Sequence, residues 1–377
     1  MDRQRMRDRI REAQRVEVTR RSLLKGIGGL GAVVAAGKAP AFIREAGAST
    51  PRKVSFMLPW LFVGGHAFEF VAMKQGWAKR GLDVDIARGY GSGAACKTIA
   101  AGQAMFGEAS FNVMVSGVAG GMDLVAIGAK LQLAPQAISC RKDSGVKTIK
   151  DLEGHSLLQA AASGDTVMFP GLVRAAKLDE SKIQKTLVHP SKLISTVVNK
   201  QADCTGSYYV SNAADLEYHV PSVHFMYADF GLQTLDLGLM TTSKMLKSEK
   251  KLVQDIVDGA MEGLKVQLLE PEKALDVYIE AKQELRTVPR KLLIQHMGNT
   301  NALCLSPAVE KRGLGWMDPE DQKRTRDVVV KYMEPKNDPP PVDKMFTNEF
   351  AGHVKLTSAE WARAKEWAAP YNPFKRS

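Results

Sequence analysis

The sequence predicts an α/β fold of two lobes, each built on a mainly parallel sheet that is covered by helices. Short apolar segments alternate with helical segments of about 10–15 residues, which is typical of parallel strands joined by helices. The alternation starts again near residue 148, which predicts a second unit of the same kind. In both halves, turns rich in glycine or serine lie between a strand and a helix, where open α/β sheets bind their ligands.

The composition is that of a soluble globular protein with about two domains: 377 residues, 45% of them apolar and 25% charged. The net charge of +11 is unevenly distributed. Residues 1–47 hold 11 of the 52 Lys and Arg but only 5 of the 41 Asp and Glu, so more than half of the excess lies there. Because the remainder is mildly basic and carries no zinc-finger, basic-zipper or aromatic RNA-binding pattern, we expect no nucleic-acid partner.

The first 48 residues are expected to be an export signal. Thr19–Lys25 contains Arg20-Arg21 and precedes a Gly- and Ala-rich apolar run at 26–37, which resembles a twin-arginine signal. The apolar run is too short to span a bilayer. Small-residue cleavage sites end at Ala41 and Ala48, so we assign residues 1–48 to the signal and expect a periplasmic protein.

The first half of the mature chain opens on an apolar strand at 53–58 that stops at Pro59. Trp60 and His66 follow, and the chain enters a helix at 67–79 through two glycines. An indole and an imidazole at the end of a strand are candidate ligand contacts. The alternative is that Trp60 fills the core and His66 only begins a helix.

A second polar turn follows the next predicted strand, at 82–86. The turn at 89–93 opens a helix at 94–101, whose unpaired N–H groups suit an anionic or strongly polar ligand atom. Ser92 and Gly93 are therefore candidates, with an ordinary turn as the alternative. A further strand at 105–110 ends at two more candidates, Ser110 and Phe111.

The second half repeats this arrangement. A strand at 156–160 leads through the turn Ser163–Thr166 into a helix at 167–176, and the turn residues are typical helix caps. They either face a ligand or only cap their own helix. A strand at 205–209 ends at Tyr208 and Tyr209, and Asp229 lies where the chain returns to the first lobe.

The predicted lobes are discontinuous in sequence. Lobe I comprises residues 49–142 and 238–377, and lobe II comprises residues 143–237. The crossings between the lobes are expected at 142–148 and 229–238.

Sequence patterns of enzymes and of metal sites are missing. The chain has no Gly-x-Ser-x-Gly, His-Glu-x-x-His or phosphate-loop pattern, and no histidine pair has metal-ligand spacing. We therefore assign no catalytic residue, metal or cofactor. Cys96, Cys140, Cys204 and Cys304 are interpreted as small buried hydrophobic residues, since their spacing identifies no disulfide.

An ordered set of short motifs carries a family resemblance: Trp60, His66, Ala72–Trp77, Gly81–Ile86, Gly91–Gly93, Ala101–Ala104 and Asp151–Gly154. In this order they resemble the type II periplasmic solute-binding proteins of ABC importers. The group that they resemble includes nitrate, sulfonate and taurine binders and the thiamine-pyrimidine-precursor synthase-like proteins. The resemblance covers almost all of the mature chain and implies a ligand cleft between two lobes.

The spacing from Trp60 to His66 is nearer to the pyrimidine-precursor branch, which resembles Asp-Trp-x-Pro-Asn-x-x-His there. The resemblance implies that Trp60 stacks on a flat ring and that His66 hydrogen-bonds it. Pro59 and Val63 replace the Asp and Asn of that pattern, and Asn212 lies near where a ligand-contacting Glu is often found. These departures leave room for another aromatic, heterocyclic or carboxylated solute. The cysteine cluster of the synthase enzymes is missing.

Together, the residues and the resemblance predict a non-catalytic, monomeric solute receptor. A small ligand would close the two lobes, and an ABC permease of the inner membrane would recognise the closed form. An exported enzyme related to the synthases and a ligand-sensing partner of a membrane receptor remain alternatives. The candidate ligand contacts are Trp60, His66, Ser92, Gly93, Ser110, Phe111, Ser163, Gly164, Asp165, Thr166, Tyr208, Tyr209 and Asp229.

Overall fold

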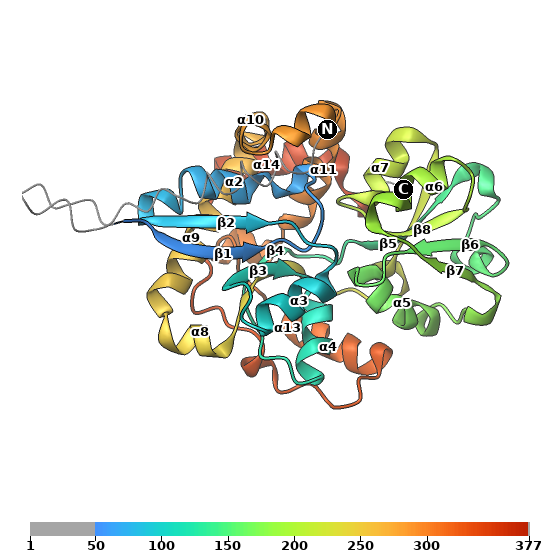
Figure 1. Cartoon of the computed structure of the whole chain (residues 1–377), viewed down its shortest axis with the longest axis horizontal. Coiled ribbons are helices and arrows are strands. Elements are labelled where there is room, and N and C mark those ends of the chain that lie inside the picture. Colours follow the sequence, from blue (N-terminus) through green and yellow to red (C-terminus); the bar gives the residue numbers. More distant parts are fainter. Residues whose placement is uncertain (1–49, 376–377) are drawn as a thin grey trace, which may run out of the picture. The chain divides into compact units, whose positions relative to one another are not determined.

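The computed structural model describes residues 50–375, and the predicted signal at 1–48 lies outside the described residues. Two five-stranded sheets organise the described chain, each with helices on both faces (Figure 1). The prediction of two α/β lobes is thereby confirmed.

The first sheet has the strand order β2-β1-β3-β10-β4. Its strands are β1 (Arg52–Met57), β2 (Leu82–Ala87), β3 (Phe106–Ala109), β4 (Val125–Leu131) and β10 (Asp236–Thr241). β1 is parallel to β2 and β3, whereas β10 is antiparallel to β3 and β4. In β2, apolar residues alternate with exposed charged ones, as expected for a strand with one covered face. All residues of β4 are buried.

The second sheet has the order β7-β6-β8-β5-β9. Its strands are β5 (Gln136–Arg141), β6 (Ser156–Gln159), β7 (Gln184–Leu187), β8 (Cys204–Tyr208) and β9 (Ser222–Met226). β6 is parallel to β7 and β8, whereas β5 is antiparallel to β8 and β9.

As predicted, the sheets are mainly parallel: four of the five strands of each run in the same direction, and β10 in the first sheet and β5 in the second run against them. β5 and β10 each enter their sheet directly from the other lobe, without a preceding crossover helix. β10 begins at the edge of the first sheet where β1 and β3 end, and β5 begins at the edge of the second sheet where β8 ends. Each therefore runs in the opposite direction to these strands.

The first lobe crossing also differs from the prediction. β5 belongs to the second sheet, so the chain crosses between Leu131 and Gln136 and not at 142–148. The sequence could not show this, because β5 is an apolar strand that suits either sheet and its partners come more than 60 residues later. The chain returns between Phe230 and Asp236.

Helices complete the two lobes (Figure 1). Beside the first sheet, α2, α10 and α14 lie on one side and α3, α4 and α13 on the other; beside the second, α5 lies opposite α6 and α7. None of the described helices is long and apolar enough to span a bilayer. The helices are α2 (Ala67–Lys74), α3 (Ser92–Ala100), α4 (Phe111–Ala119), α5 (Gly164–Ala175), α6 (Leu193–Val198), α7 (Asn212–His219), α8 (Ser243–Ser248), α9 (Lys250–Leu269), α10 (Pro271–Ala281), α11 (Arg290–Cys304), α12 (Pro307–Arg312), α13 (Pro319–Val328) and α14 (Ser358–Ala368).

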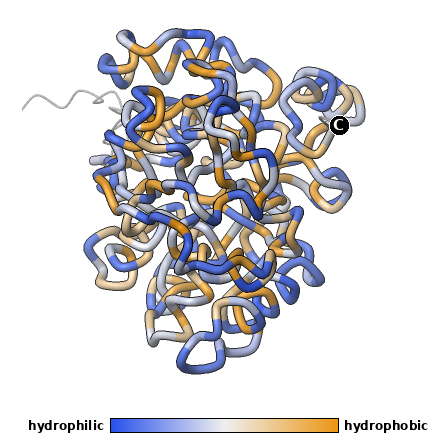
Figure 2. Tube along the Cα trace, turned by 90° about the vertical axis from the view of Figure 1, so that its right-hand side faces the viewer, coloured by the Kyte–Doolittle hydropathy of each residue, from blue (hydrophilic) through white to orange (hydrophobic). Residues whose placement is uncertain are grey.

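Apolar side chains fill the space between sheets and helices in both lobes. Phe56, Phe68 and Trp77 lie in the core of the first lobe, and Leu157 and Phe169 in that of the second. Figure 2 shows hydrophilic residues alternating with hydrophobic ones along most of the trace, as expected where each element covers a core with one face.

A disulfide joins β5 to β8. Cys140 and Cys204 face each other in the strand register, with their Cα atoms 4.0 Å apart. The interpretation of all four cysteines as simple buried residues was therefore wrong for this pair, which the strand pairing brings together across 64 residues. It holds for Cys96 and Cys304, which are buried and free.

Candidate functional site

A cavity lies where strand ends of the two lobes face each other. It contains about 540 Å³ of space that no atom fills, part of it open to solvent. The first lobe contributes Trp60, His66 and Lys130 to its lining, and the second contributes Asp165 and Tyr208.

Seven of the thirteen candidate residues line this cavity: Trp60, His66, Ser92, Ser163, Gly164, Asp165 and Tyr208. The other six are not among the lining residues: Gly93, Ser110, Phe111, Thr166, Tyr209 and Asp229. The turns at strand ends therefore indicated where the cavity lies, but they did not identify each side chain that lines it.

Backbone hydrogen bonds hold Trp60 at the boundary between the lobes. The N–H of Gly89 donates to the carbonyl of Trp60 at 3.1 Å, and the N–H of Gly91 donates to that of Pro59 at 2.8 Å. The half-buried indole packs against an apolar cluster of the second lobe that contains Leu193. Trp60 therefore belongs to the first lobe by sequence but contacts the second.

The glycine turn before α3 is a contact between the lobes. Gly91 has a φ of +135°, and a Cβ there would lie 2.1 Å from the carbonyl oxygen of Ala162 in the second lobe. The N–H of Gly93 donates to this same oxygen at 3.0 Å. We expected Gly93 to offer a free donor to a ligand, but the facing lobe uses it.

Two glycines make room for the polar groups of the opposite wall. A Cβ at Gly164 would lie 1.8 Å from Oη of Tyr208, and a Cβ at Gly206 would lie 2.0 Å from Oδ2 of Asp165. A larger residue at either glycine would displace these groups. Gly164 was predicted as a site residue, whereas Gly206 was missed because a glycine inside a strand has many explanations.

A buried polar network holds both lobe crossings together. Oδ2 of Asp236 accepts hydrogen bonds from Oγ of Ser110 at 2.7 Å, Nδ2 of Asn112 at 2.8 Å and Nε2 of Gln136 at 2.7 Å. Burial raises the pKa of Asp236 to about 6. Ser110 thus stabilises the crossings and does not line the cavity. Asp236 was missed, although an acid within an apolar strand was a usable signal.

The remaining four candidates also lie elsewhere. Phe111 is in the core, edge-on to Phe346 with ring centres 5.5 Å apart. The hydroxyl of Thr166 hydrogen-bonds that of Ser163 at 2.8 Å. The ring of Tyr209 is buried, and Asp229 is half-buried outside the lining.

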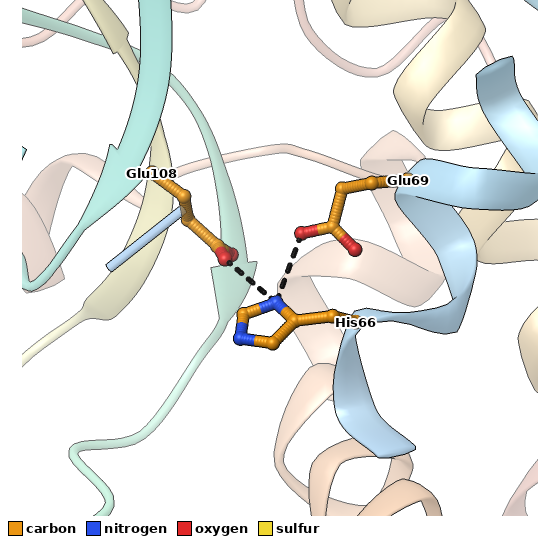
Figure 3. A group of neighbouring side chains, drawn as sticks. All are labelled: His66, Glu69 and Glu108. Carbon is orange, nitrogen blue, oxygen red and sulfur yellow. Dashed lines mark hydrogen bonds and ion pairs between the residues drawn. The ribbon is translucent and has the colours of Figure 1, made fainter. Parts of the chain in front are cut away.

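Four buried ionisable side chains form a cluster beside the cavity. Nδ1 of His66 is 3.2 Å from Oε1 of Glu69 and 3.7 Å from Oε2 of Glu108 (Figure 3). Nζ of Lys130 lies 2.7 Å from Oε1 of Glu108. The ring of His66 therefore turns Nδ1 toward the carboxyl groups and Nε2 away from them.

Burial sets the charges of this cluster. It raises the pKa of Glu69 to about 8 and lowers that of His66 to about 3, so both side chains are neutral at pH 7. Burial also raises the pKa of Glu108, against the opposing effect of Lys130. Although burial opposes it, Glu108 and Glu69 raise the pKa of Lys130. We conclude that an ion pair of Glu108 and Lys130 is the charged part of the cluster.

The same cluster has the spacing of a metal site. Ligand atoms of His66, Glu69 and Glu108 lie within 4.8 Å of one another. However, Lys130 already supplies the positive charge at Glu108, and a divalent cation would be repelled by this ammonium group. The carboxyl groups of the cluster therefore suit the ammonium group of Lys130 better than a metal ion. A signal for this cluster was present in the sequence, because Glu108 and Lys130 are charged residues within apolar strands.

We predict that Glu69 makes the protein less stable as the pH rises from 6.5 to 8. The unfolded chain loses this proton near pH 4.5 and the native carboxyl keeps it to about pH 8, so the unfolded state binds fewer protons in this interval. The free energy of unfolding should fall by roughly 1 kcal/mol per pH unit from this group. His66, with a pKa of 6.5 in the unfolded chain and about 3 in the native one, adds a slope of opposite sign that fades as the pH rises above 6.5, and this slope is common to the wild type and the variant. Glu69→Gln should flatten the slope in urea unfolding, and an equal slope in both proteins would contradict the assignment.

Comparison with known proteins identifies the family. The family model described as NMT1/THI5 like matches residues 64–274. No curated protein matches the sequence closely enough to count as a relative.

Solved structures show the same fold at low sequence identity. The alkanesulfonate-binding protein SsuA from Xanthomonas axonopodis pv. citri, bound to MOPS, has a TM-score of 0.60 at 11% identity, covering 78% of this chain and 96% of that one. The aliphatic sulphonate binding protein SsuA of Escherichia coli has 0.59 at 15% identity, covering 82% and 94%. The nitrate-binding protein NrtA from Synechocystis PCC 6803 has 0.57 at 10% identity, covering 83% and 88%.

These structures confirm the expected two-lobed fold of periplasmic binding proteins. Because the matched segment is more than half of the chain, the resemblance read from the motifs is also confirmed: the chain belongs to the NMT1/THI5-like family.

Proposed function

We propose that this protein is a periplasmic solute receptor of an ABC importer, exported by the twin-arginine route. It binds a small aromatic or heterocyclic solute, or an anionic nitrogen- or sulfur-containing one, between its lobes. The observation that carries the proposal is the cavity itself, which side chains of both lobes line and which Trp60 borders. A ligand that contacts both lobes favours the closed arrangement over any open one.

Each wall has a distinct part in this proposal. Trp60 offers a flat apolar face for a ring, and Nε2 of His66 offers a hydrogen bond to its edge. Tyr208 adds a hydroxyl from the second lobe, and this hydroxyl accepts a hydrogen bond from Gln136 at the first crossing. Ligand contacts are thereby linked to the segment about which the lobes would move.

Transport and sensing use the same cavity, so a separate experiment distinguishes them. Deletion of the gene should abolish uptake of the solute if the protein serves an importer. If uptake persists and only the cellular response to the solute is lost, the sensing alternative is correct.

We predict that a solute raises the melting temperature of the full chain and that Trp60→Ala abolishes this shift. The panel comprises pyrimidines, aromatic amines, aromatic acids, sulfonates and nitrate. A ligand at about 100 times its dissociation constant adds on the order of 2.7 kcal/mol to the stability. Trp367→Ala is the matched control, because Trp367 packs against Tyr371 and is not among the lining residues.

The control should keep the full shift. The proposal fails if no compound shifts the wild type, or if Trp60→Ala responds as the wild type does.

A further inference from the structure

A histidine of α11 joins the two lobes beside the cavity. His296 belongs to the first lobe, and its Nε2 lies 2.9 Å from Oδ1 of Asp215 in α7 of the second lobe. The two helices lie side by side, one in each lobe (Figure 1). The side chain of His296 is 3% exposed and that of Asp215 is 27% exposed, so water competes little for this hydrogen bond.

The second ring nitrogen of His296 determines where the ring proton lies. The backbone N–H of Gly64 donates to Nδ1 at a long 3.4 Å, so Nδ1 is an acceptor and the proton is on Nε2. Nε2–H then donates to the carboxylate of Asp215, which gives a charge-assisted hydrogen bond. His296 therefore connects a turn of the first lobe to a helix of the second.

This connection adjoins the cavity in both lobes. Gly64 begins the turn that carries His66, and a Cβ at Gly64 would lie 1.9 Å from a carbonyl oxygen of α11. Thr300, one turn along α11 from His296, lines the cavity, as does Asn212 at the start of α7. Separation of the lobes along this side of the cavity would therefore break the hydrogen bond.

We propose that the His296–Asp215 hydrogen bond holds the lobes closed over the cavity and sets how often the cavity opens. The inference rests on the solute-binding function proposed above, and His296 lies outside the segment 64–274 that the family model matches. His296 is a positioning residue, because it is not among the lining residues and acts through α7 and the turn of His66. A solute that contacts both lobes stabilises the same closed arrangement, so loss of this bond should also weaken its binding.

A second contact between the lobes provides a reporter of opening. The N–H of Gly93 donates to the carbonyl of Ala162 in the facing lobe at 3.0 Å, so its exchange with deuterium requires this contact to break. The N–H of Leu58 donates to the carbonyl of Ala87 within the first lobe at 2.8 Å and is the reference for unfolding of that lobe. Because the exchange rate follows the population of the open form, even rare opening is measured.

The test measures hydrogen–deuterium exchange of the full chain without solute, resolved to single amides by mass spectrometry. His296→Asn places an amide oxygen near Nδ1 that can accept from Gly64, but its side chain is too short to donate to Asp215. His296→Gln places an amide nitrogen near Nε2 that can donate to Asp215. Gly93 should exchange at least about tenfold faster in His296→Asn, as expected for loss of a hydrogen bond to a charged group, and near the wild-type rate in His296→Gln.

Asp215→Ala removes the same hydrogen bond from the second lobe. It should speed the exchange of Gly93 by a similar factor, and combining it with His296→Asn should add little, because both changes remove one bond. His353→Asn is the matched control, since His353 pairs with Asp258 at 3.2 Å within the first lobe. The control should leave the exchange of Gly93 unchanged, and Leu58 should exchange at the wild-type rate in every variant.

Three results would overturn the inference: wild-type exchange of Gly93 in Asp215→Ala, equal acceleration in His296→Gln and His296→Asn, or acceleration of Leu58 as large as that of Gly93. Asp215 is partly exposed, so its variant keeps the test decisive even if a change at the buried histidine prevents folding. None of these measurements needs a solute. Closure by His296 can therefore fail while solute binding stands, and absence of any solute in the melting panel would reject the proposed function alone.

Discussion

Lys130→Met is expected to destabilise the protein by about 3–5 kcal/mol, the usual cost of leaving a buried charge without its partner. Lys130 is buried in β4, and its Nζ lies 2.7 Å from Glu108 in β3. Met has a similar length and no charge, so the packing against Phe68 is largely kept while Glu108 loses its partner. Urea unfolding at pH 7.5 measures the loss.

Combining Lys130→Met with Glu108→Gln separates the effect of the unpaired charge from the effect of altered packing. The double variant should recover much of the stability, because no uncompensated carboxylate remains. The loss from Lys130→Met alone should also be smaller at pH 5, where a buried Glu108 without its cation takes up a proton. If Lys130→Met lowers the free energy of unfolding by less than about 1 kcal/mol at pH 7.5, and by the same amount at pH 5, then Lys130 does not balance the charge of Glu108.

Removing the disulfide should cost about 4 kcal/mol, since it closes a loop with a sequence separation of 64 residues. The double variant Cys140→Ala/Cys204→Ala should lose this stability in urea unfolding without reductant, and wild type treated with reductant should lose a similar amount. Cys96→Ala is the control for the small cavity that any buried cysteine leaves. Reductant should lower its stability as much as it lowers that of wild type, because its disulfide is intact, and should not change the stability of the double variant. Equal stability of oxidised and reduced wild type would contradict a structural role for the bond.

The sequence predicted the fold where local signals decide the structure. Pro59 stops the first strand, and the glycine turn at 89–93 separates a strand from a helix, so both turns fall at the cavity as expected. The sheets that β5 and β10 join, and the strands with which each of them pairs, could not be predicted in the same way. Each suits either sheet by its apolar pattern, and only the pairing of distant strands decides its lobe and direction.

The same limit explains which site residues were missed. Glu108 and Lys130 meet because β3 and β4 flank β10, which enters the sheet more than 100 residues later. Gln136 and Asp236 meet because both crossings lie side by side. In contrast, Trp60 and Asp165 could be predicted, because each is placed by the strand end or turn that immediately adjoins it.

We propose that the cavity binds one solute and returns it unchanged. Calorimetric titration of the full chain with the solute from the melting panel, followed by chromatography of the released compound, tests it most directly. We expect one site per chain, loss of binding in Trp60→Ala and full recovery of the unmodified solute. Conversion of the solute into a product, or undiminished binding by Trp60→Ala, would contradict it.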